Sequence, residues 1–141
     1  MANEASFNTS LAIEKDNLHY RQSANFQADV SAAKGPTPGI VLAVDTWAQV
    51  DLSLLTTPGL CFLANLSEDY TVVIGLRDTA SGEYYPLLDL LPGEAYPVRL
   101  SQFIGQELES TAGTGTAGSG CTLALKGVGG SAYVRVEAFE K

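Results

Sequence analysis

Apolar and polar residues alternate with a period of two along several short stretches of the chain. The clearest examples are Asn25–Ser31 and Ala132–Glu140. Successive side chains of a β-strand point to opposite faces, so this alternation predicts strands that bury one face. In the last stretch we expect one set to lie in the core and the other to face outward. The core set is Ala132, Val134, Val136 and Ala138.

Residues that favour turns separate these stretches from one another. Lys15-Asp16-Asn17 should join a first strand, which includes Leu11 and Ile13, to a second at Leu18–Ser31. These two strands should form a hairpin, and Phe26, Ala28 and Val30 of the second strand should face the core. Further strands are expected at residues 40–44, 49–52, 60–66, 71–76, 84–88, 94–100, 123–126 and 132–140.

Proline-glycine pairs mark the turns between several of the expected strands. Pro58-Gly59 and Pro92-Gly93 should each form a tight turn, because proline fixes φ and glycine accepts the positive φ that follows. Residues 67–69 should close a hairpin between the strands at 60–66 and 71–76.

The pattern as a whole predicts an all-β protein. No stretch shows the period of a long amphipathic helix, and turn signals recur every eight to twelve residues or so. We therefore expect a single antiparallel β-sandwich or jelly-roll-like barrel with an N-terminal arm. With 141 residues the chain should hold one domain, divided into an arm at residues 1–10 and a β domain at residues 11–141.

Composition narrows the choice of partners. The net charge is −8, with 8 basic against 16 acidic residues, so phosphate-rich nucleic acid and anionic membranes are disfavoured. Charged residues make up only 17% of the chain, against a usual share of about 25%. Part of the surface should therefore be uncharged polar or be covered by a partner.

Two cysteines and the N-terminus indicate the compartment. Cys61 lies in an apolar stretch and should be a small buried hydrophobic residue, although a disulfide with Cys121 stays open. The first residues lack the basic and apolar regions of a signal peptide, and no apolar run approaches the roughly 20 residues of a membrane span. We expect synthesis in a cytoplasm.

The motifs that could carry chemistry are weak. Gly113–Gly118 has the letters G-x-G-x-x-G, but it lies in a Gly-, Ala-, Ser- and Thr-rich stretch that precedes a strand, which favours a surface loop. His19 is the sole histidine and has no evident nucleophile beside it. Glu83, Asp89 and Glu94 lie near turns, where a pair of carboxylates could serve glycoside cleavage, but among 16 acids some pairing is expected by chance. We predict no enzyme, no catalytic or metal-binding residue and no cofactor.

Aromatic residues are the better candidates for function. Trp47 lies beside a turn, where packing in the core or at its rim competes with an exposed role, and Tyr84-Tyr85 should point to opposite faces of one strand. Exposed aromatics anchor protein interfaces or stack on sugars. The candidate partner contacts are Phe7, Trp47, Tyr84, Tyr133 and Phe139.

The region from Gly39 to Leu100 resembles small virion proteins of tailed bacteriophages. The resemblance rests on the following motifs: Leu55–Gly59, Phe62–Leu66, Ile74-Gly75, Tyr85–Leu87 and Leu91–Glu94. It covers about half of the chain, and its motifs are structural turns and strands rather than chemical groups.

The resemblance implies a capsid decoration (cement) protein that binds and stabilises the assembled phage head. It implies a homotrimer whose partner is the major capsid protein, located on the capsid surface of the virion after synthesis in the host cytoplasm. The alternative is a tail or head-fibre module that binds host surface glycan.

Overall fold

The computed structural model describes residues 5–30, 34–101, 104, 107–108 and 119–141. The chain divides into two compact units, Met1–Ser31 and Ala32–Lys141. The described residues form strands, turns and loops without a helix, so the all-β fold class is confirmed. The boundary expected after residue 10 falls inside the first strand, and the units separate at residues 31 and 32 instead.

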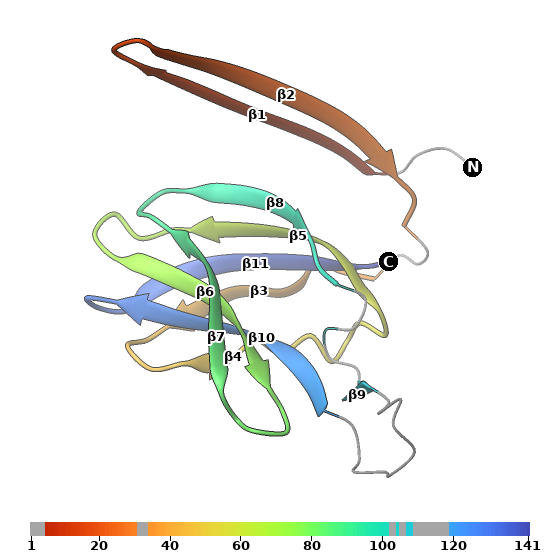
Figure 1. Ribbon diagram of the computed structural model, residues 1–141. Coiled ribbons are helices and arrows are strands. Elements are labelled where there is room, and N and C mark those ends of the chain that lie inside the picture. The colour runs from red at the N-terminus through yellow and green to blue at the C-terminus, as the bar shows by residue number, and fades with distance from the viewer. Residues whose placement is uncertain (1–4, 31–33, 102–103, 105–106, 109–118) are drawn as a thin grey trace. The chain divides into compact units, whose positions relative to one another are not determined.

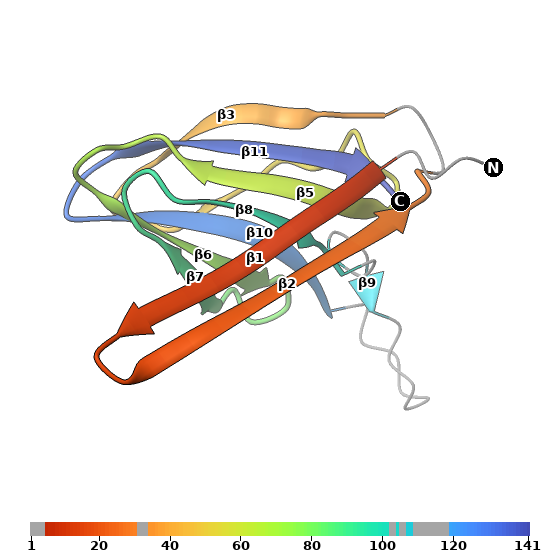
Figure 2. The ribbon, with the colours of Figure 1, turned by 90° about the horizontal axis from the view of Figure 1, so that it is seen from above.

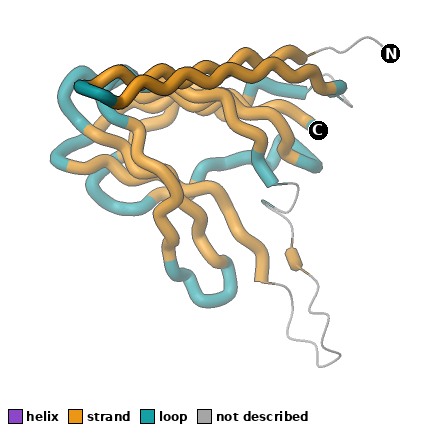
Figure 3. The backbone as a smooth tube through the Cα atoms, turned by 45° about the horizontal axis from the view of Figure 1, so that its top comes forward, coloured by secondary structure: helices purple, strands orange, loops and turns teal. Residues whose placement is uncertain are grey.

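The first unit is a two-stranded antiparallel ribbon. Strand β1 (Ala5–Lys15) pairs with β2 (Leu18–Ala28) without a break, from Ala5 opposite Ala28 to Lys15 opposite Leu18 (Figure 2). The predicted turn is confirmed, because only two residues join the strands and Asp16 takes a positive φ of 51°. Figure 3 shows the two strands running together along the length of the ribbon.

The prediction that Phe26 faces a core is wrong. Its side chain is 43% exposed and stacks on the ring of Phe7, with the ring centroids 4.6 Å apart. The alternation in this stretch identified an apolar face correctly. A ribbon of two strands has no second layer of its own to cover that face.

The second unit contains two antiparallel sheets (Figure 1). The first sheet has the order β3-β11-β5-β8, formed by Thr37–Ala43, Ala132–Glu140, Pro58–Asn65 and Ala95–Arg99. The second has the order β4-β10-β6-β7, formed by Ala48–Gln49, Ser119–Val128, Thr71–Asp78 and Tyr84–Leu90. The short β9 (Glu107–Leu108) pairs with the start of β10.

One hydrophobic core joins the two sheets. It takes Leu63 and Val134 from the first sheet and Ile74 and Leu123 from the second, each at most 2% exposed. The inward set predicted for β11 is confirmed, because Ala132, Val134, Val136 and Ala138 are all 2% exposed or less. The two sheets therefore form a sandwich with its core between them.

The prolines in the described strands lie at positions where the backbone N–H is not needed for a hydrogen bond to a neighbouring strand. Pro38, Pro86 and Pro97 lie in β3, β7 and β8, which are the outer strands of the two sheets. Pro58 is the first residue of β5. Proline is tolerated at sheet edges and strand starts because it cannot donate to a neighbouring strand.

One of the two predicted proline-glycine turns is wrong. Pro92-Gly93 forms its turn, with a φ of 76° at Gly93 and the Glu94 amide donating to Leu91 at 3.0 Å. Pro58 and Gly59 belong to β5 instead. A Cβ at Gly59 would come within 2.8 Å of the Lys141 backbone, so this glycine serves close approach of the last residue rather than a turn.

The predicted hairpin between residues 60–66 and 71–76 is also wrong. Strands β5 and β6 belong to different sheets, and the largely exposed segment between them connects one sheet to the other. Ser67 shapes the crossing, since its hydroxyl accepts hydrogen bonds from the amides of Asp69 and Tyr70 at 3.1 and 3.0 Å. Loop length alone does not distinguish a hairpin from a crossing between sheets.

Candidate interaction surfaces

The ribbon is amphipathic, with one apolar and one polar face. Residues paired directly across an antiparallel ribbon share a face. The apolar ribbon face consists of Ala5, Phe7, Thr9, Leu11, Ile13, Lys15, Leu18, Tyr20, Gln22, Ala24, Phe26 and Ala28. Its large side chains are exposed: Leu11 at 55%, Ile13 at 41%, Leu18 at 56% and Tyr20 at 47%.

The opposite face carries the polar residues of the ribbon. This polar ribbon face consists of Ser6, Asn8, Ser10, Ala12, Glu14, His19, Arg21, Ser23, Asn25 and Gln27. His19 lies here, with Nδ1 3.6 Å from an oxygen of Glu14, and both side chains are well exposed. His19 thus pairs with an acid across the two strands of the ribbon.

A second apolar surface covers the outer side of the β3-β11-β5-β8 sheet. Tyr133 stands directly opposite Leu42, and Arg135 stands opposite Ile40. Phe62 on β5 stands opposite Glu137. Four large apolar side chains of this outer sheet face are exposed, which are Ile40 at 58%, Leu42 at 47%, Phe62 at 37% and Tyr133 at 60%, whereas Leu60 on the same face is 6% exposed.

Arg135 and Glu137 neutralise each other on the outer sheet face, and Arg99, opposite Leu60, adds one further cation there. Arg135 Nε lies 3.8 Å from a carboxylate oxygen of Glu137, and both side chains are partly exposed. Of the candidate contacts named from sequence, Tyr133 belongs to this surface. Ile40 and Leu42 were missed, although the unbroken apolar run of residues 40–44 indicates a strand that is apolar on both sides.

Trp47 and Tyr84 stack on each other beside the second sheet. Their ring centroids are 5.3 Å apart with an angle of 8°, and Arg77 lies over the Tyr84 ring at 5.8 Å. Gly75 makes room for the indole, because a Cβ there would approach two Trp47 ring carbons at 2.7 and 2.9 Å. Both side chains are half-buried, so the stack fixes the Trp47 loop to the sheet.

The remaining candidate contacts separate into covered and exposed residues. Phe139 is half-buried, and a Cβ at Gly35 would lie 2.9 Å from its ring. Phe7 is 9% exposed and stacked on Phe26. Tyr85 is 54% exposed while its neighbour Tyr84 is half-buried, as expected for adjacent residues of one strand.

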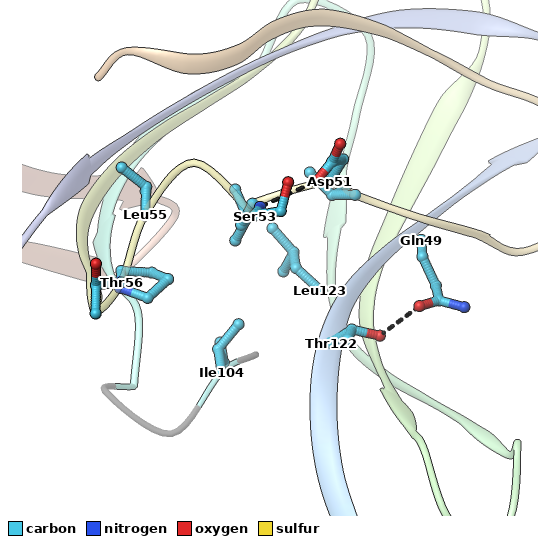
Figure 4. A pocket seen from close by; sticks show the side chains of 11 residues that line it. Gln49, Asp51, Ser53, Leu55, Thr56, Ile104, Thr122 and Leu123 are labelled. Carbon is cyan, nitrogen blue, oxygen red and sulfur yellow. Dashed lines mark hydrogen bonds between the residues drawn. The ribbon is translucent and has the colours of Figure 1, made fainter. Parts of the chain in front are cut away.

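A pocket of about 500 Å³ opens beside the loop that follows β4 (Figure 4). Leu55, Ile104 and Leu123 supply apolar lining, and Thr122 donates to Gln49 at 3.2 Å. At its rim the Ser53 amide donates to Asp51 at 2.9 Å, and hydrogen bonds from Ser53 hold the pKa of this exposed carboxyl below its usual value. Its described lining includes no histidine, cysteine or lysine beside a hydroxyl.

Of the three acids considered as a possible carboxylate pair, Glu94 stabilises a turn. Glu94 accepts the Leu91 amide at 2.8 Å, across the Pro92-Gly93 turn. Within the described ranges no group of three or more His, Cys, Asp or Glu could hold a metal ion, and no helix is long and apolar enough to cross a membrane. The Gly113–Gly118 motif lies outside the described residues.

The prediction of a buried Cys61 is confirmed. Its side chain is 2% exposed, and Cys61 and Cys121 are not bonded to each other. Burial raises the pKa of the Cys61 thiol to about 12. The thiolate is the form that reacts with electrophiles, so the native fold suppresses reactivity at this position.

A labelling experiment tests this burial. With iodoacetamide at pH 8, Cys61 of the folded protein should remain unmodified, and in guanidinium chloride it should react fully. Peptide mass mapping reads both states. Rapid native labelling of Cys61 would contradict the burial assigned to β5.

Comparison of the chain with protein-family models, with curated proteins and with solved structures finds no significant match in any of the three.

Proposed function

We propose that this protein is a structural component of a bacteriophage virion, a capsid decoration protein that binds and stabilises the assembled head as a homo-oligomer. The observation that carries the proposal is the outer sheet face, an exposed apolar surface on a two-sheet body. Its four large side chains at about half exposure leave on the order of 400 Å² uncovered, the size of patch that often marks a protein interface.

The chemistry of the outer sheet face suits a protein partner. Its Arg135–Glu137 pair is internally neutral, so burying it brings no net charge into the contact. Tyr133 combines a large apolar ring with a polar tip, a composition enriched at interface centres. Binding to the assembled shell but not to free subunits would stabilise the shell by mass action.

Shell binding can be tested with heads assembled without this protein. The wild type should co-sediment with them and raise the temperature at which they open. Tyr133→Ser should weaken binding by about tenfold or more, equivalent to roughly 1.4 kcal/mol. Tyr85→Ser is the matched control, because it removes a similarly exposed tyrosine from the other sheet.

Two outcomes would contradict the proposal. One is a wild-type protein that does not bind such heads, and the other is equal binding by the Tyr133 and Tyr85 variants. The alternative function, a fibre module that binds glycan, needs an aromatic ring with a free face. Tyr84 stacks on Trp47 and also has Arg77 over its ring, so this ring is already engaged by residues of the protein itself. Binding to a glycan array with no affinity for heads would favour the fibre module.

A further inference from the structure

The ribbon of the first unit has a face that two strands alone cannot bury. Isolated two-stranded hairpins are marginally stable in water, and a stable sheet normally packs its apolar face against another layer. Here every large apolar side chain of β1 and β2 lies on one face, which also holds Thr9, Lys15 and Gln22. A sequence that maintains this alternation over eleven residues in each strand specifies a covered surface.

The uncovered area is large enough for a specific contact. A large apolar side chain presents roughly 150–250 Å². Five such side chains of the apolar ribbon face are about half exposed, which leaves on the order of 500 Å² uncovered in each copy. These side chains are Leu11, Ile13, Leu18, Tyr20 and Phe26. Two such faces in contact would bury about 1,000 Å², the lower limit for a specific interface.

Charge favours a second copy of the same chain as the occupant. The protein carries a net charge of −8, so most approaches of two copies bring acidic groups together. The apolar ribbon face has no acidic residue and only Lys15 as a cation, at the turn end. It is therefore a surface on which two copies meet without bringing acidic groups together.

The same charges disfavour other classes of partner. Lys15 and Arg21 are the only formally cationic residues of β1 and β2, and they lie on opposite faces. Anionic lipids and nucleic acids are recognised by clusters of basic residues. The ribbon has no such cluster.

We infer that the protein self-associates by packing the apolar ribbon face of one copy against the same face of a second copy. Each copy contributes the same patch, as symmetric interfaces require. This inference rests on the proposed function for its biological role, where it supplies the contact between protomers. It uses residues of β1 and β2, which differ from those of the outer sheet face proposed for the shell.

Two pairs of charge substitutions in the full chain test the inference. Leu11→Asp and Ser10→Asp introduce the same residue at adjacent positions of β1 on opposite faces. Phe26→Asp and Asn25→Asp do the same on β2. Both variants of a pair carry the same added charge and the same low strand propensity of aspartate. A difference in self-association between them therefore comes from the face of the ribbon that carries the aspartate.

Sedimentation velocity and native mass spectrometry should find an oligomer for the wild type and for Ser10→Asp and Asn25→Asp. Leu11→Asp and Phe26→Asp should weaken self-association, so that these variants are still monomeric at protein concentrations at least about tenfold above the one at which the wild type associates. The thermal unfolding of the core unit should be unchanged, because the substituted side chains are exposed on the ribbon. A monomeric wild type, or equal association within each pair, would overturn the inference.

Head binding by the same variants separates this inference from the proposed function. If Leu11→Asp keeps the oligomer but no longer binds heads, the ribbon contacts the shell, and the inference fails while the proposed function stands. If Leu11→Asp is monomeric and Tyr133→Ser binds heads normally, the inference stands and the proposed use of the outer sheet face fails.

Discussion

Replacing Val136 by aspartate should lower the free energy of unfolding by about 4 kcal/mol or more, enough to unfold many domains of this size. Val136 is fully buried at the centre of β11 and belongs to the core between the two sheets. A carboxylate there would lose its hydration with no partner to replace it. The midpoint of urea unfolding, followed by circular dichroism, measures the loss.

Glu137→Gln is the matched control for Val136→Asp. It changes the next residue of the same strand, on the opposite face, and removes a partly exposed ion pair with Arg135. Exposed pairs of this kind contribute up to about 1 kcal/mol, so the midpoint should hardly move. If the two variants unfold at the same urea concentration, β11 does not present the faces described.

Predictions from the sequence were correct where the structure depends on residues that are close together along the chain. The alternation in β11 identifies its buried face because the side-chain period of a strand is two. The turn at Asp16 follows because two polar residues separate two alternating stretches. Both predictions need only neighbours along the chain.

Contacts between segments distant in sequence were harder to foresee. At the end of β5, where the chain passes to the other sheet, the Asn65 side chain donates hydrogen bonds to backbone carbonyls 5 and 25 residues away. The Trp47–Tyr84 stack depends on the space at Gly75, in a third segment. Alternation indicates that a face is apolar but does not identify what covers it, which explains the error at Phe26.

Asn65 provides the second large expected effect. It is 2% exposed, and its amide nitrogen donates to the carbonyls of Tyr70 at 2.8 Å and Leu90 at 3.0 Å. Its oxygen accepts the Ser67 amide at 3.0 Å. The side chain at the end of β5 thus satisfies backbone groups at the start of β6 and the end of β7, and it holds the two sheets together.

Asn65→Asp should destabilise the protein by about 3 kcal/mol at pH 7. The substitution replaces the NH₂ donor by a second acceptor and places it against two carbonyl oxygens. Urea midpoints at pH 7 measure the effect. Asn25→Asp, which changes the same residue type on the exposed polar ribbon face, should leave the midpoint nearly unchanged and controls for the added negative charge.

The stability gap between Asn65→Asp and the wild type should depend on pH in a defined direction. Burial against carbonyl oxygens disfavours the carboxylate, so the folded-state pKa of the new group lies above its unfolded value of about 3.9. The folded variant therefore binds more protons than the unfolded one between these two pKa values, and its stability relative to wild type falls as pH rises through that window. The gap should narrow when the pH is lowered toward 4, where a protonated carboxyl regains one donor. A gap that stays constant from pH 7 to pH 4 would contradict the role assigned to the Asn65 donors.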